Sequence, residues 1–288
     1  MTASDIKFRC SSLGKIMNSR VGLTDNQTET LATLQAKEKR TEKQEKTMQE
    51  LLAKQSANEL PEGIKNHLAD IYAAAVHYRR EEVFNKYLAK GTEREEDSIT
   101  LLSLQRKMML KKNDAKFADA FIKGEPDIIL ADHIIDIKTS WNLNSFLRTK
   151  VNSINMDYYW QVQGYMALTG AKTAEVCYCL VNGTAKAIDD EKRRMSYQFA
   201  DPYSEEYKEQ CRQIEINMIF DIAAFIKENP TFNFDNDLVR WYQDRIWDIP
   251  ASQRLCCFPV ERNDADIAAM RERIEICREW MNENLFKN

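Results

Sequence analysis

The sequence has little of what phosphate-loop and histidine-based enzymes need. Only eight glycines occur among 288 residues, and none of them belongs to a glycine-rich loop that would hold a nucleotide phosphate. The three histidines, His67, His77 and His133, are scattered along the chain. The sequence therefore supports neither a P-loop, nor histidine-led catalysis, nor a zinc site.

Long apolar runs are also absent. No uninterrupted apolar stretch approaches the length that spans a membrane, and Met1–Lys7 lacks the charged-then-apolar order of a signal peptide. Hydrophobic residues make up 43% and charged residues 30% of the chain, which is typical of a soluble globular protein. We expect a cytoplasmic protein with no membrane partner.

The seven cysteines show no Cys-x-x-Cys spacing. Cys177 and Cys179 alternate, and Cys256 and Cys257 are adjacent, within apolar stretches that resemble strands. Cysteines in such stretches are usually small core residues. We therefore predict that they pack in the core, in preference to metal binding or a disulfide.

Positive charge is not in excess. The chain has 41 lysines and arginines against 45 aspartates and glutamates, a net charge of −4, and such a balance does not favour nucleic acid in general. The distribution matters more than the sum, because five basic residues lie close together before the central segment described next. This cluster is either a cleft wall that follows a nucleic-acid backbone or a solvated helix face: Arg106, Lys107, Lys111, Lys112 and Lys116.

The stretch Gly124–Trp141 predicts a β-hairpin on which the rest of the chain depends. Its two apolar runs, Ile128–Leu130 and Ile134–Ile135, flank a short polar break at Asp132 and His133. β-branched runs around such a break are typical of two antiparallel strands.

Three charged residues stand on this apolar hairpin. Because side chains of a strand alternate between faces, Asp136 and Lys138 share one face, opposite Ile135 and Ile137. If the loop between the two strands has an even number of residues, the residue numbers of directly opposed positions add up to an odd number. Asp127 then lies on the same face as Asp136. Two carboxylates and an ammonium would then meet at one place.

Two neighbouring carboxylates repel each other and are costly to bury unless a cation lies between them. Mg²⁺, or Mn²⁺ in its place, suits such a site, because these ions take oxygen ligands and keep positions for water and substrate phosphate. Lys138 would orient or deprotonate a water and offset charge that develops on a phosphate. The set fits phosphodiester hydrolysis.

The same residues resemble a known family motif. Pro126-Asp127, followed by Asp136-Ile137-Lys138 on a second strand, resembles the PD-(D/E)XK nuclease motif. The later Gln161-Val162-Gln163-Gly164-Tyr165 resembles the Gln-x-x-x-Tyr helix of the RecB-like, lambda-exonuclease-like branch, the YqaJ-like viral recombinases. A lone Asp-x-Lys is usually a solvated strand edge, but the order of these features favours the family.

The resemblance covers roughly Glu95–Val181 and, more weakly, the N-terminus. It implies an α/β restriction-endonuclease-like core, a small mixed sheet flanked by helices, with a helical N-terminal arm and a helical C-terminal extension. We expect a phosphate-site segment and arm in residues 1–60, the nuclease core in 61–200 and the extension in 201–288.

The activity that the resemblance implies is Mg²⁺-dependent exonuclease digestion of double-stranded DNA ends, 5′ to 3′, of the bacterial or phage recombination type. A single-strand annealing protein and a homo-oligomer are the implied partners. No iron–sulfur cluster is expected, since the clustered cysteine spacing of some RecB-like nucleases is missing. An endonuclease on the same fold, a non-catalytic DNA-binding module and a metal-free structural protein are the alternatives.

The family pattern also assigns roles to single residues. Asp127, Asp136 and Glu95 would hold the metal, with the Ile137 carbonyl as a further ligand. Lys138 would activate water, and Gln161 would support the site. Aspartate stands at Asp136 where the family more often has glutamate, and its shorter reach would shift the ion slightly.

Glu95 has two interpretations. Gly91–Glu95 resembles the Gly-x-x-x-Glu segment that supplies a further metal-site carboxylate in the family, with Glu93 and Glu96 as alternatives. Thr92 and Glu95 also have the spacing of a helix capping box.

Residues near the N-terminus resemble a 5′-phosphate site. Cys10-Ser11-Ser12 resembles the family's Thr-Ala-Ser segment, with Ser12 at the serine position and Arg9 nearer to it than the family's arginine. A hydroxyl at a helix start suits an anion, although a plain N-cap explains Ser12 equally well. Further DNA contacts are expected from Tyr165, Lys111 and Lys112.

Apolar periodicity predicts the remaining elements. The expected elements are a solvent-exposed helical arm in Thr24–Ala57, a helix from Pro61 to Gly91, a helix in Ser153–Leu168 ended by Gly170, a strand in Ala174–Val181, one amphipathic helix in Glu205–Glu228, a helical stretch with Trp241 and Trp247, an edge strand in Arg254–Val260, and a last helix capped by Asn263.

Overall fold

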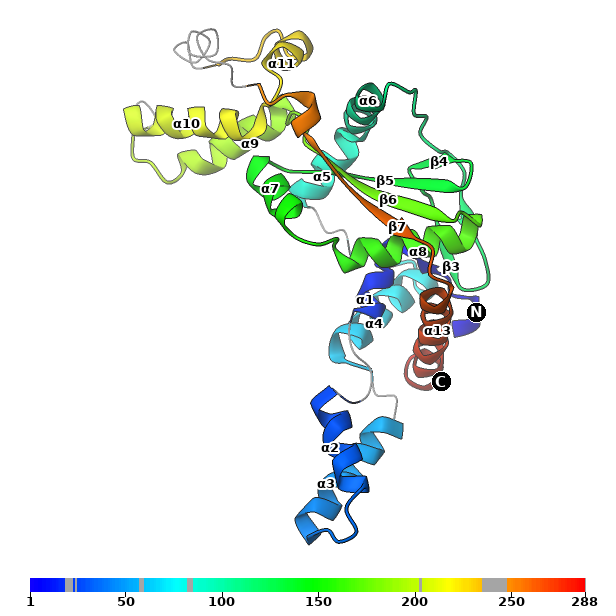
Figure 1. Cartoon of the computed structure of the whole chain (residues 1–288). Coiled ribbons are helices and arrows are strands. Elements are labelled where there is room, and N and C mark those ends of the chain that lie inside the picture. Colours follow the sequence, from blue (N-terminus) through cyan, green and yellow to red (C-terminus); the bar gives the residue numbers. More distant parts are fainter. Residues whose placement is uncertain are drawn as a thin grey trace.

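The computed structural model describes residues 1–18, 23, 25–56, 60–81, 85–201, 204–234 and 248–287. At its centre is a four-stranded sheet in the order β4-β5-β6-β7 (Figure 1). The pairs β4–β5 and β6–β7 are antiparallel and β5–β6 is parallel. The strands are β4 Ile128–Leu130, β5 His133–Thr139, β6 Thr173–Cys179 and β7 Leu255–Glu261.

A smaller sheet lies beside it, in the order β1-β3-β2. It is formed by β1 Phe8–Arg9, β2 Phe117–Ala118 and β3 Ile122–Gly124. Two mixed sheets with helices confirm the predicted α/β class. The helices are α1 Leu13–Met17, α2 Asp25–Gln35, α3 Glu42–Ser56, α4 Glu62–Val76, α5 Lys86–Glu93, α6 Glu95–Arg106, α7 Leu143–Val151, α8 Met156–Thr169, α9 Ala185–Ser196, α10 Glu205–Met218, α11 Ile222–Glu228 and α13 Asp264–Asn284.

The two faces of the central sheet are covered by different helices. On one face, Val162 and Met166 of α8 pack with Val176 of β6. On the other, Ile99 of α6 packs with Ile137 of β5. The alternation of side chains along β5 and β6 therefore separates two apolar cores, and the charged residues of β5 lie on the α8 face.

The predicted hairpin is confirmed, with its register. Ile128 lies opposite Ile135 and Leu130 lies opposite His133, so the loop consists of two residues, Ala131 and Asp132. His133, which was predicted to lie in the polar break, is instead the first residue of β5. The even loop continues the register to Asp127 opposite Asp136, as predicted.

The helical arm consists of α2 and α3, which pack on each other through a small cluster of Leu23, Leu31, Met48 and Leu51. Figure 1 shows this pair away from the central sheet, which agrees with the expected exposed arm. The predicted end of the helix from Pro61 to Gly91 is wrong. Helix α4 already ends at Val76, and Gly91 lies inside α5. None of the described helices has the length and apolarity needed to cross a membrane.

The C-terminal part departs from the prediction of one helix in Glu205–Glu228. The chain turns between α10 and α11, where Asn182 Oδ1 accepts hydrogen bonds from the backbone N–H groups of Phe220 and Asp221. Asp221 then caps α11 by accepting from Ala224 N. A side chain distant in sequence makes this break, so local periodicity misses it. Trp241 and Trp247 lie outside the described residues.

Other terminal elements match their predictions. Asn263 caps α13 by accepting from the N–H groups of Ala265 and Asp266. Strand β7 lies at the edge of the sheet, and Gly170 ends α8 in the left-handed region at φ 78°. The predicted apolar stripe of α13 is buried: Ile267, Met270, Ile274, Cys277 and Met281.

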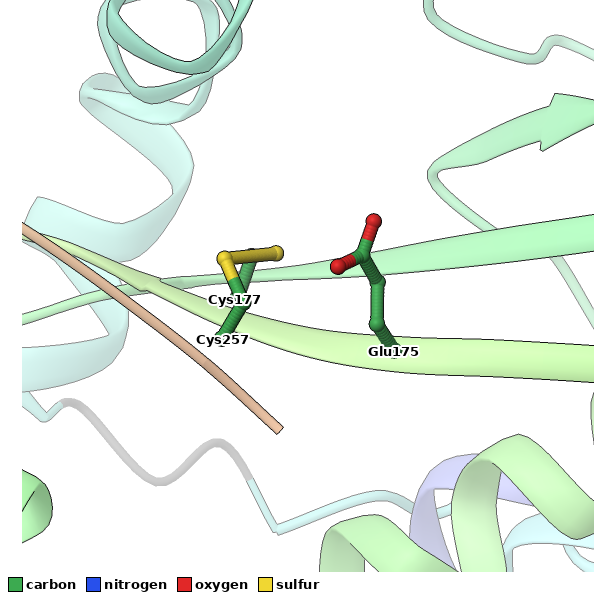
Figure 2. A group of neighbouring side chains, drawn as sticks. All are labelled: Glu175, Cys177 and Cys257. Carbon is green, nitrogen blue, oxygen red and sulfur yellow. A yellow bond between two sulfur atoms is a disulfide. The ribbon is translucent and has the colours of Figure 1, made fainter. Parts of the chain in front are cut away.

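The cysteines are only partly as predicted. Cys179 is a buried free thiol, but Cys177 of β6 and Cys257 of β7 lie opposite each other and form a disulfide (Figure 2). Their Cα atoms are 4.1 Å apart, within the close approach of directly opposed antiparallel residues. Some of these cysteines therefore pack in the core and two form a disulfide. The alternation of Cys177 and Cys179 within one strand does not predict a partner on another strand.

Reduction of this disulfide is expected to lower stability. The bond joins residues 80 apart in sequence, and release of such a loop costs about 2–4 kcal/mol of unfolding free energy. Cys257→Ser should show the same lower melting temperature with and without a reductant, whereas the adjacent Cys256→Ser should keep the sensitivity. Thiol titration of the denatured, unreduced chain should find five groups. A count of seven would contradict the bond.

Candidate active site

A pocket of about 720 Å³ opens beside the hairpin. Its walls come from the end of β5, from α5, α7 and α8, and from the start of α6. The charged side chains that line it are Glu95, Asp127, Asp136, Lys138 and Arg148. Four of these five are the residues that the sequence predicted to meet.

Asp136 is the most enclosed of them, with no solvent exposure. Its Oδ1 accepts a hydrogen bond from Gln161 Nε2 at 3.1 Å. Its Oδ2 lies 2.8 Å from Lys138 Nζ in an ion pair, although the angles do not make a hydrogen bond. Burial and the Glu95 charge raise the pKa of Asp136 against the opposing effect of Lys138.

Asp127 lies directly before β4 and lines the same pocket as Asp136. Its Oδ2 accepts from the backbone N–H of Ile137 at 2.7 Å, which ties the end of β4 to β5. Burial and the charge of Asp136 raise the pKa of Asp127 to about 7, despite the Ile137 hydrogen bond and Lys138. The two carboxylates therefore oppose each other's ionisation.

The Ile137 carbonyl points to the same side of β5. In an extended strand the N–H and C=O of one residue point to the same side, and the N–H of Ile137 points to Asp127. This direction suits the role of a further oxygen ligand.

Lys138 is held from three sides. Its Nζ contacts Asp136, donates to Gln161 Oε1 at 3.2 Å and lies 4.4 Å from the centroid of the Tyr158 ring. Burial lowers the pKa of Lys138, but Asp136 and Asp127 outweigh burial and raise it overall. Lys138 is therefore an ammonium at neutral pH and suits charge stabilisation better than proton abstraction.

Tyr158 was not among the predicted site residues. It stands three residues before Gln161 on α8, and both line the pocket. The helical spacing Tyr158, Gln161, Tyr165 could have identified it as part of the same stripe.

Gln161 links the charged residues to the interior. It donates to Asp136 and accepts from Lys138, and its Nε2 also donates to the hydroxyl of Tyr165 at 2.9 Å. Tyr165 is 4% exposed, so the predicted DNA contact from this residue is wrong. Its spacing of four from Gln161 serves to orient the amide.

Glu95 reaches the pocket as the first residue of α6, and Lys112 Nζ lies 2.9 Å from its Oε2. The alternative of a capping box is wrong, because Thr92 lies in α5 and its hydroxyl donates to Leu88 O. Glu93 and Glu96 are exposed and do not line the pocket. The geometry favours Glu95 as the third acidic residue.

The fold as a whole resembles those of solved exonuclease structures. No protein-family model and no curated protein matches the sequence. The structure resembles that of a phage-related exonuclease from Haemophilus somnus 129PT, with TM-score 0.60 and 22% identity over 97% of this chain and 95% of that one. It also resembles an alkaline exonuclease (LHK-Exo) from Laribacter hongkongensis, with TM-score 0.52 and 14% identity over 97% and 91% of the two chains.

The chain shares its fold with these two exonucleases. The predicted resemblance is confirmed at the level of the fold. In this fold the hairpin, α8 and the start of α6 bring the charged side chains of the motif into one pocket.

The predicted phosphate residues are placed differently. Arg9 and Ser12 do not line the pocket, and the Ser12 hydroxyl donates to Arg9 O, whereas Ser11 does line it. Ser11 precedes Ser12 in the same short 3-10 helix, Cys10–Ser12, so the predicted segment reaches the pocket through Ser11 and not through Ser12.

The basic cluster before the hairpin is largely neutralised. Arg106 pairs with Glu175, Lys112 with Glu95 and Lys116 with Glu125. The exposed Lys111 is not among the residues that line the pocket. The interpretation of this cluster as a continuous cleft wall is therefore weakened.

The donor atoms of the pocket fit a hard divalent cation. Asp127, Asp136 and the Ile137 carbonyl offer oxygen, and Asp136 Oδ2, which contacts Lys138 Nζ, accepts no hydrogen bond from any described residue. Mg²⁺ needs only one or two direct carboxylates, because waters and substrate oxygens complete its shell. Glu95, now paired with Lys112, does not have to lie in direct reach.

Another group of ligand-type atoms lies on the opposite face of the sheet. Among the described residues, Glu175, Cys177 and Cys257 place such atoms within 4.8 Å of one another (Figure 2). Here Arg106 pairs with Glu175 and the two sulfurs are bonded. These partners already satisfy the group.

Proposed function

We propose that the chain is a metal-dependent exonuclease that hydrolyses phosphodiesters at the ends of double-stranded DNA. The observation that carries this proposal is the meeting of Asp127, Asp136, Lys138 and Glu95 in one pocket of a fold shared with exonucleases. The names of the structural neighbours support the same activity.

The ion would be Mg²⁺ or Mn²⁺, held by Asp127, Asp136, the Ile137 carbonyl and Glu95. When bound, it supplies Lewis-acid polarisation of a phosphate oxygen and a more acidic water. Its charge would also offset the burial and the neighbouring carboxylate charges that raise the pKa of both aspartates.

The protein's own groups position the reaction. Lys138 presents a fixed ammonium to charge that develops on the phosphate. Gln161 holds Lys138 and Asp136 together, and Tyr165 fixes Gln161 from the interior. Tyr158 covers the ammonium from one side and keeps it in place without competing for a proton.

The finer features of the proposal come from the family resemblance. They are digestion from 5′ to 3′, a 5′-phosphate contact in the Cys10–Ser12 segment, a single-strand annealing partner and a role in phage-type recombination. Digestion of linear duplexes labelled at the 5′ or the 3′ end, beside a closed circular duplex, tests the polarity and the need for a DNA end. Early release of the 5′ label with an intact circle is the expected result, whereas cleavage of the circle would favour an endonuclease.

Divalent metal is expected to raise the melting temperature. A ligand that binds only the folded state at about 100 times its Kd adds about 2.7 kcal/mol, or about 5 °C for a chain of this size. Scanning calorimetry with Mg²⁺ or Mn²⁺, then with excess chelator, measures the shift. Asp136→Asn should lose most of the shift, and an equal shift in this variant would contradict its role as ligand.

A further inference from the structure

The charged side chains that line the pocket differ in whether they have an ion-pair partner. Asp136 is paired with Lys138, and Glu95 is paired with Lys112. Arg148 also lines the pocket, yet its side chain forms no ion pair or hydrogen bond with any described residue. A cation without a carboxylate partner beside three acidic residues is available for an anion from outside the chain.

Arg148 belongs to a polar face of α7. Asn142, Ser145, Arg148 and Thr149 all line the pocket, and their spacing puts them on one side of the helix. Phe146 is 1% exposed and anchors the other side in the core. The hydroxyls of Ser145 and Thr149 donate to the backbone carbonyls of Asn142 and Ser145, so the guanidinium is the group of this face that is left to bind a ligand.

The start of α7 is fixed before any ligand arrives. Asn142 Oδ1 accepts from Ser145 N, and Ser145 Oγ accepts from Asn142 N, so both residues form a capping box. The helix axis and the position of Arg148 are thus determined by the protein itself, which lowers the ordering cost of binding.

We propose that α7 is a phosphate-binding wall, in which Arg148 contacts a backbone phosphate of the DNA strand held in the pocket. The inference rests on the proposed function and deepens it by naming the residue that binds the substrate backbone. Lys138 and the metal would act on the scissile phosphate. Arg148, on the α7 wall, would hold a neighbouring one, since a guanidinium forms two parallel hydrogen bonds with phosphate oxygens.

Lys150 provides a matched control on the same helix. It is exposed and two residues further on, so it points away from the Arg148 face, and its charge acts on Cys256 of β7. It does not line the pocket. Arg148→Gln and Lys150→Gln remove the same charge from two sides of one helix.

The test measures equilibrium binding of a fluorescent linear duplex over a range of salt concentrations, with a chelator present so that no cleavage occurs. One phosphate contact contributes about 0.7–0.9 to the slope of log affinity against log salt. Arg148→Gln is expected to lower that slope by this amount and to weaken binding about tenfold at low salt. Lys150→Gln should behave as wild type, and Arg148→Lys should restore the slope but only part of the affinity.

The outcomes separate this inference from the proposed function. Equal slopes for wild type and Arg148→Gln, or an equal loss in Lys150→Gln, would overturn the phosphate contact even if the protein cuts DNA. Binding with the predicted slope change but no cleavage after metal is added would support Arg148 and reject the nuclease. No binding of DNA by wild type would overturn both.

Discussion

Lys138→Ala is expected to lower the turnover rate on linear duplex DNA by about 10²–10³-fold. Among the described residues that line the pocket, Lys138 is the only ammonium, and the variant removes its charge from Asp136 and the Tyr158 ring. Because this charge stabilises the transition state more than the bound substrate, the loss should fall on kcat with little change in KM.

Two controls show that the loss is chemical. Lys112→Ala removes an ammonium that pairs with Glu95 but does not line the pocket, and we expect a much smaller loss. Lys138→Ala should still melt at a higher temperature with Mn²⁺, because the carboxylates remain. Equal turnover in wild type and Lys138→Ala, measured by release of labelled nucleotide, would reject the assigned role.

The centre of the site could be predicted because strand geometry is periodic. Alternation placed Asp136 and Lys138 on one face, and an even loop was sufficient to place Asp127 beside them. The spacing of four between Gln161 and Tyr165 likewise puts both side chains on one stripe of α8, where they form a hydrogen bond. Each of these relations depends on short-range geometry, which the sequence expresses directly.

The rest depends on contacts between distant segments. Asn182 breaks the predicted C-terminal helix, Cys177 finds its partner across the sheet, and Lys112 meets Glu95 after a chain reversal. No local pattern encodes such pairs. Whether Ser11 or Ser12 faces the pocket is likewise decided by packing, because neighbouring residues of a tight helix point in different directions.

Arg148 illustrates the same limit at the functional level. In the sequence it is one of 41 basic residues, and the cluster between residues 106 and 116 is a stronger signal. In the structure most of that cluster is paired with carboxylates, whereas Arg148 has no carboxylate partner within the part of the chain that the structure describes. Local density of charge predicts binding poorly when internal partners are not known.

Asp127→Asn is expected to abolish nuclease activity and to stabilise the metal-free protein at the same time. Asparagine keeps an oxygen that accepts from Ile137 N–H but lacks the charge that a metal requires. Loss of one ligand should lower activity by at least about 10³-fold. The buried repulsion with Asp136 is removed as well, so the metal-free variant should melt above the metal-free wild type.

The pH dependence of this stabilisation follows from the raised pKa of Asp127. In the unfolded chain the carboxyl has its ordinary pKa of 3.8, and in the folded protein burial and Asp136 raise the pKa to about 7. Well below pH 3.8 the carboxyl is neutral in both states and does not change the free energy of unfolding. As pH rises from 3.8 to 7 the unfolded state loses its proton first, so wild type loses stability. The cost at pH 8 is at most about 4 kcal/mol.

Calorimetry of wild type and Asp127→Asn from pH 4.5 to 8, with a chelator present, should therefore give melting curves that separate as pH rises. Added Mn²⁺ should raise the melting temperature of wild type only. The difference in melting temperature between the two proteins at pH 8 should therefore become smaller, because the ion supplies the missing positive charge between the two aspartates. A variant less stable than metal-free wild type at pH 8 would show that the two carboxylates are not in conflict, and the case for a cation between them would fail.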